Sequence, residues 1–83
     1  MRVTFDPEID MAYIYLTGPN EAHSADHTEP LIVDLRPGSR RLINLDFDSQ
    51  GRLLGIEIAG AATALPRSLL AAAEKPRRST RDG

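Results

Sequence analysis

Two runs of alternating apolar and polar residues, separated by a short turn, constrain this sequence most. Residues 42–47 read Leu-Ile-Asn-Leu-Asp-Phe and residues 53–58 read Leu-Leu-Gly-Ile-Glu-Ile. A period of two is typical of strands that hold one face against a core, and the intervening Asp48-Ser49-Gln50-Gly51 is typical of a turn. We therefore expect an antiparallel hairpin with Asn44 and Asp46 facing outward. Its inward positions are Ile43, Leu45, Phe47, Leu54, Ile56 and Ile58.

Further strands are expected before this hairpin. Residues 2–5 alternate and end in the turn residues Asp6-Pro7-Glu8, after which Met11 to Leu16 is apolar on both faces. Such a strand needs cover on both sides. Residues 21–29 are polar and fit either an edge strand or a loop. Residues 31–35 form another expected strand, which ends at Arg36-Pro37-Gly38-Ser39.

After Gly60 the composition changes to alanine and leucine, which favours a helix. Pro66 suits the first turn of a helix over residues 67–74, with an apolar stripe of Leu65, Leu69 and Leu70 against the sheet. The fold class is thus α+β, mainly β: an antiparallel β-meander of about five strands with one short C-terminal helix. Residues 1–75 form a single domain, and residues 76–83 are expected to be a disordered basic tail.

Charge and cysteine content exclude several classes of function. The chain has no cysteine, which removes disulfides, thiolate catalysis and cysteine-based zinc sites. Residues 1–73 carry six basic and ten acidic side chains, net −4, whereas residues 74–83 carry four basic and two acidic ones, net +2. Nucleic-acid binding is not expected of an acidic body. No segment suits a membrane span or a leader, so we expect a cytoplasmic protein.

Two segments together resemble a bacterial family, the domain of unknown function 2283 family. They are Val3-Thr4-Phe5-Asp6-Pro7-Glu8-Ile9-Asp10-Met11-Ala12-Tyr13-Ile14-Tyr15-Leu16 and Asp46-Phe47-Asp48-Ser49-Gln50-Gly51-Arg52-Leu53-Leu54-Gly55-Ile56-Glu57-Ile58. The resemblance implies a small β-meander with a short C-terminal segment, implies no activity, and suggests an antitoxin-like role beside a partner protein. Pro30 to Arg41 is an extra segment relative to this pattern.

Three groups of residues could carry chemistry, but each is explained better by structure. Asp46, Asp48, Gly51 and Glu57 almost match a calcium loop, yet that loop needs flanking helices, and the flanks here have the period of strands. His23 and His27 would lie about 13 Å apart on a strand, too far for one ion, although a site shared between subunits stays open. The carboxylates of Asp6, Glu8 and Asp10 are expected to be solvated turn residues.

Two functions follow from these observations. The favoured one is a non-enzymatic binding or protein-interaction module with no catalytic residue, cofactor or metal. We expect a homodimer, because one short helix covers only one face of the Met11–Leu16 strand, and a further protein partner is compatible with the sequence. The alternative is a small enzyme or small-molecule-binding protein. Its pocket would lie near Tyr13, Tyr15, His23 and His27, with Asp10 or Asp26 as acid or base.

Overall fold

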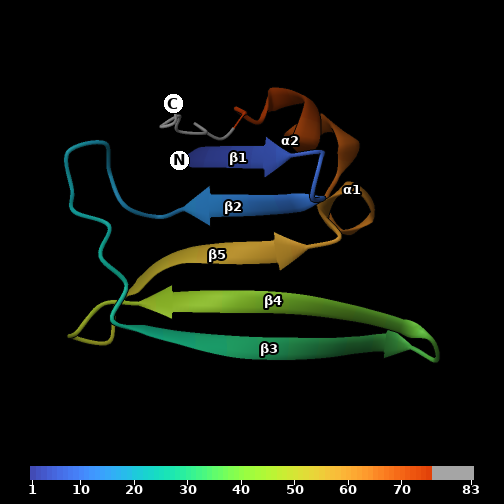
Figure 1. The fold of residues 1–83 in the computed structure, drawn as a ribbon, viewed down its shortest axis with the longest axis horizontal. Helices are drawn as coiled ribbons and strands as arrows, with labels where there is room; N and C mark the ends of the chain where they lie inside the picture. The colour runs from blue at the N-terminus through green and yellow to red at the C-terminus, as the bar shows by residue number, and fades with distance from the viewer. Residues whose placement is uncertain (76–83) are drawn as a thin grey trace.

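The computed structural model describes residues 1–75 and arranges them as one five-stranded antiparallel sheet with two short helices (Figure 1). The strands are β1 (Arg2–Asp6), β2 (Met11–Tyr15), β3 (His27–Arg36), β4 (Ser39–Phe47) and β5 (Leu53–Ala59), and the helices are α1 (Ala61–Ala64) and α2 (Arg67–Ala72). The prediction of a mainly β protein with about five strands is confirmed. The predicted basic tail over 76–83 lies outside the described residues.

The strand order is β1-β2-β5-β4-β3, which differs from the expected simple meander. β3, β4 and β5 are consecutive neighbours, but β2 pairs with β5, so residues 16–26 cross the ends of the sheet to reach its far edge (Figure 1). Three strand spacings amount to about 15 Å, which this segment spans easily. The crossing places β5 in the centre and leaves β3 as one edge of the sheet.

The predicted hairpin is confirmed as β4 and β5, with Ile43 opposite Ile58 and Leu45 opposite Ile56. The core lies on this face of the sheet, around the buried residues Ala12, Ile58 and Ala61. The side chains packed against that cluster include those of Phe5, Ile14, Ile43, Ile56, Leu65 and Leu70. Among the described residues no large side chain is fully buried, so the core is thin.

The single predicted helix is wrong in detail, because the structure has two short ones. α1 ends at Ala64, and the next residue, Leu65, has an extended backbone (φ −112°, ψ 152°), the conformation that a following proline favours. Pro66 was expected in the first turn of the predicted helix and instead stands as the N-cap of α2, which ends at Ala72 rather than at Glu74. Glu74 instead pairs with β1: its N–H donates to the carbonyl of Val3, and its carbonyl accepts from Phe5.

β2 is paired on both edges, and Ala12 lies in the core. The opposite face carries Tyr13 and Tyr15, which are half-buried. Residues 11–15 of the strand that motivated the homodimer prediction therefore find cover within the chain. Leu16, the last residue of the predicted strand, is 43% exposed, and four other exposed large apolar side chains belong to the β3–β4 hairpin: Leu31, Ile32, Leu35 and Leu42.

Candidate functional site

The polar face of the sheet, opposite the core, holds a cluster built around Tyr13 on β2. Its ring lies over Gly55 of β5: a Cβ placed on Gly55 would stand 2.3 Å from the Tyr13 hydroxyl oxygen. Because this position has no side chain, the tyrosine reaches across the central strand to β4. There its hydroxyl donates a hydrogen bond of 2.7 Å to Oδ2 of Asp46.

A chain of hydrogen bonds extends from this contact in both directions. Oδ1 of Asp46 accepts from the Thr28 hydroxyl on β3 at 2.6 Å, and the Tyr13 oxygen lies 2.8 Å from Nε2 of His23. Since a phenol has one proton and Tyr13 gives it to Asp46, His23 must donate from Nε2. In the neutral ring Nδ1 then accepts from the Thr17 hydroxyl, 3.2 Å away. These hydrogen bonds thus link the crossing segment, residues 16–26, to strands β2, β3 and β4.

The surroundings of Tyr13 and Asp46 shift their pKa values in opposite directions. Burial raises the pKa of Tyr13 far above its usual value, and the hydrogen bond to Asp46 together with the charge of that carboxylate raises it further. Burial alone would raise the pKa of Asp46 too, but hydrogen bonds from Thr28 and Tyr13 and the proximity of His23 outweigh it, and the pKa is lowered. At neutral pH the pair is therefore a neutral phenol and a carboxylate, and Tyr13 does not act as a base.

Aromatic rings extend the cluster toward the N-terminus. The Tyr13 and Tyr15 ring centres are 4.6 Å apart, and His23 lies 5.4 Å from Tyr13 and 5.2 Å from Tyr15. The Arg2 guanidinium stacks 4.1 Å over Tyr15, and its Nε lies 3.4 Å from Oε1 of Glu74. Of these groups, Arg2, Tyr15, His23 and Glu74 border an open cleft of about 390 Å³ between β1 and the crossing segment, lined also by Thr17 and Glu21.

The predicted pocket is thus assembled in part. Tyr13, Tyr15 and His23 come together, but the ring of His27 pairs with Glu29 at 2.8 Å and lies near Phe47. The two histidines were expected on one polar strand; instead His23 lies in the crossing segment, and only His27 belongs to β3.

The proposed acid or base residues do not join the cluster. Asp10 has a positive φ of 56° and accepts hydrogen bonds from the start of α1, including one of 2.8 Å from the Ala62 N–H. It therefore ties the β1–β2 turn to α1. Asp26 donates its backbone N–H to the carbonyl of Phe47, which aligns the start of β3. In the first turn Asp6 accepts from the Glu8 N–H, as a turn residue does, but Asp6 is buried rather than solvated.

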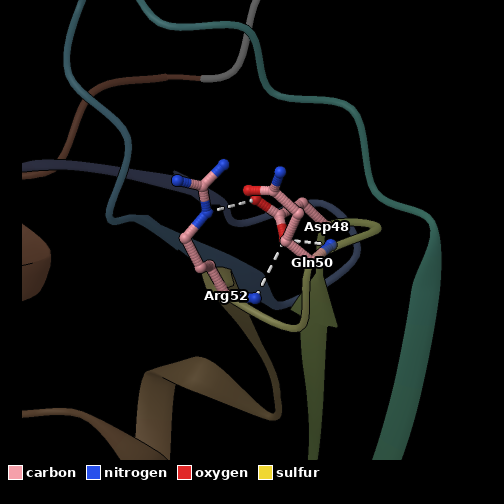
Figure 2. Close-up of polar contacts among 3 residues, drawn as sticks. All are labelled: Asp48, Gln50 and Arg52. Atoms are coloured by element: carbon pink, nitrogen blue, oxygen red, sulfur yellow. Dashed lines mark hydrogen bonds and ion pairs between the residues drawn. The ribbon is translucent and has the colours of Figure 1, made fainter.

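The near-match to a calcium loop is a β-turn between β4 and β5 (Figure 2). Asp48 accepts hydrogen bonds of 2.9 Å from the N–H groups of Gln50 and Arg52 and from Nε of Arg52. These bonds, with the backbone N–H of Arg52 first, lower the pKa of Asp48 and outweigh the opposing effect of burial. Gly51 adopts a φ of 82°, which favours glycine. Glu57 is half-buried and accepts a hydrogen bond from the side chain of Asn44.

The residues of the cluster that the sequence did not assign to it are Asp46, Thr28, Thr17 and Gly55. The period of two did place Asp46 on the polar face, and it could have suggested a tyrosine partner there. What it could not indicate was the pairing of β2 with β5, on which the contact depends.

A family model described as "Protein of unknown function (DUF2283)" matches residues 2–61. The match confirms the resemblance drawn from the sequence and includes the extra segment Pro30 to Arg41. No curated protein and no solved structure matches the chain. Over the residues that the structure describes, no helix is long and apolar enough to cross a membrane.

Proposed function

The chain belongs to the DUF2283 family, whose description assigns no function. From its structure we propose that it is a non-enzymatic protein-interaction module that binds a partner through the exposed edge of β3. The observation that carries this proposal is the exposure of apolar side chains on both faces of that edge. Leu31 and Ile32 point to opposite faces and are 45% and 58% exposed, and Leu35 is 59% exposed.

Edge strands of monomeric proteins usually avoid such a composition, because an unpaired edge invites another strand. β3 is ten residues long, and residues 31–33 read Leu-Ile-Val, as a strand does when it is covered on both faces. Nothing in the described residues lies beyond it in the sheet (Figure 1). Addition of a strand from another polypeptide would satisfy the backbone groups of this edge and shelter its apolar side chains.

The polar cluster supports a non-enzymatic role. Both oxygens of Asp46 and the hydroxyl of Tyr13 are engaged within the chain, and the raised pKa of Tyr13 keeps it neutral. The cluster thus stabilises the crossing segment, which brings β3 to the edge of the sheet.

Site-specific photo-cross-linking in the native host tests the proposal. A photoreactive side chain at position 32 should form a defined adduct with a polypeptide, whereas the same group at Ser68, exposed on α2, should not. The absence of an adduct at position 32, or equal adducts at both positions, would contradict the β3 edge as the binding element.

A second candidate rests on the cleft beside Tyr15. The Tyr15 and His23 rings, tilted at 60° to each other, and the Arg2 guanidinium suit a small planar or anionic ligand. Ligand-observed NMR with aromatic and anionic metabolites, compared between wild type and Tyr15→Ala, tests this alternative. Binding that Tyr15→Ala abolishes would favour it; equal signals in both proteins would exclude the cleft.

A further inference from the structure

We infer that the strand added to the β3 edge is the β3 strand of a second copy of this chain, paired antiparallel about a two-fold axis beside Ile32. This inference rests on the proposed function and names its partner. It starts from the thin core: only four apolar residues of the described chain are buried, namely Ala12, Leu54, Ile58 and Ala61. A small domain of this kind often completes its burial by association.

The arrangement of apolar residues on β3 suits this axis. In an antiparallel pair centred on Ile32, that residue lies opposite its own copy, and Leu31 lies opposite the partner subunit's Val33. Within the chain Ile32 is already the cross-strand neighbour of Leu42, which is 43% exposed. The two hairpins would then present one continuous apolar row across the junction, made of Leu42 and Ile32 from each copy.

The charges on β3 are complementary in the same register. Asp34 pairs with Arg40 and Arg36 pairs with Ser39, so Leu35 is the extra residue of a bulge and Arg36 takes the next pairing position. If Leu35 is skipped in the same way at the junction, Asp34 lies opposite the partner subunit's Pro30, and Arg36 lies opposite the partner subunit's Glu29. Two Arg–Glu pairs form, and no two like charges face each other.

These two charges are suitably placed for such a contact. Arg36 makes no ion pair among residues 1–75, and within the same residues the Glu29 carboxylate is paired with the exposed ring of His27, 2.8 Å away. Pro30 removes one N–H donor from this edge but keeps its carbonyl as an acceptor. Backbone pairing across the edge is thereby interrupted at Pro30, which favours the register centred on Ile32 over longer alternatives; the Arg36–Glu29 contacts at its ends are made by side chains.

Cysteine cross-linking is a direct test, because the chain contains no cysteine of its own. Ile32 and Leu35 are nearly equally exposed, at 58% and 59%, and so form a matched pair. In the proposed dimer the two copies of position 32 have Cβ atoms about 5 Å apart, whereas those of position 35 are roughly 20 Å apart. Under mild oxidation Ile32→Cys should become a disulfide-linked dimer and Leu35→Cys should stay reduced.

Charge exchange gives a second readout that does not depend on oxidation. Light scattering should give twice the 9.1 kDa chain mass for wild type, and the monomer mass for Glu29→Arg and for Arg36→Glu alone. An equimolar mixture of the two variants should regain the dimer mass, because each junction then pairs Arg with Glu. Recovery on mixing also shows that both variants are folded.

A monomeric wild type, equal cross-linking at positions 32 and 35, or variants that do not recover on mixing would each overturn the inference. The proposed function fails separately. If the photo-adduct at position 32 contains a different protein while the purified chain is monomeric, the β3 edge is a binding element for that protein and the homodimer is wrong. If no adduct forms there, the proposed function itself is wrong.

Discussion

Gly55→Ala should be one of the most damaging single-methyl additions to the sheet, although alanine is usually the better strand residue. The new Cβ would lie 2.3 Å from the Tyr13 hydroxyl oxygen and 2.5 Å from its Cζ atom. The ring must therefore swing off the central strand, and the hydroxyl loses both its bond to Asp46 and its contact with His23.

The magnitude follows from these two contacts. A hydrogen bond to a charged group contributes about 1.5–3 kcal/mol and a neutral one about 0.5–1.5 kcal/mol. Alanine regains about 0.5–1 kcal/mol of backbone conformational entropy relative to glycine. Because the cluster is only half-buried, we expect a net loss near the lower end, about 1.5–2.5 kcal/mol in the free energy of unfolding. With a urea m-value of about 1 kcal/mol/M, the midpoint should fall by about 2 M.

Equilibrium urea denaturation, followed by far-ultraviolet circular dichroism, measures this change. The control is the same substitution in a Tyr13→Ala background, where the ring is gone and Gly55→Ala should be neutral or stabilising by about 0.5–1 kcal/mol. Equal destabilisation in both backgrounds, or none in the wild-type background, would refute the role assigned to the close approach of ring and backbone.

Four further predictions concern the polar groups. Asp46 has a lowered pKa in the folded state. Its contribution to stability is therefore present above the ordinary carboxyl pKa of about 3.9 and is lost as the pH falls through the pKa of the folded state. Urea midpoints measured against pH should show this loss, and Asp46→Asn should flatten it. Tyr13 has a raised pKa in the folded state, so its contribution to stability is complete below about pH 10 and is lost at higher pH. Ultraviolet titration should show one phenol that ionises at unusually high pH and that Tyr13→Phe removes. Two phenols that both ionise in the ordinary range would contradict this. Asp48→Ala should lower the urea midpoint more than Ser49→Ala in the same turn, because three donors lose their acceptor, and equal midpoints would argue against that role. Calorimetry with calcium should detect no stoichiometric site, since the turn lacks flanking helices; micromolar binding abolished by Asp48→Ala would show otherwise.

The part of the fold that the sequence predicts best is the part held together by local interactions. The β4–β5 hairpin follows from its alternation and from Asp48 and Gly51 in the turn, and all of this information lies within a short stretch. The start of α2 follows from Pro66 for the same reason. The extension of β3 through Pro30 was not predicted, because a proline is acceptable only on an edge, and the edge is a property of the whole sheet.

The candidate site was predicted less completely, because it depends on contacts between distant segments. Aromatic and imidazole side chains near Tyr13 could be grouped from the sequence, and three of the four proposed residues do come together. Their partner Asp46 could not be assigned, since it reaches Tyr13 only when β2 lies beside β5 and Gly55 opens the way. Alternation fixes the face of a residue, whereas neighbours across strands depend on topology.

The pairing of Glu74 with β1 has a consequence for how large an assembly of this chain can grow. Sheets with two open edges can add subunits at both ends and form fibrils without a fixed length. Here the backbone of Glu74 bonds to Val3 and Phe5, so the outer edge of β1 is occupied in its middle by the chain itself. Growth by strand addition is then blocked at one side of the sheet. If two copies pair through β3 as we propose, that pairing uses up the remaining edge, and assembly through this sheet ends at a closed complex instead of a polymer.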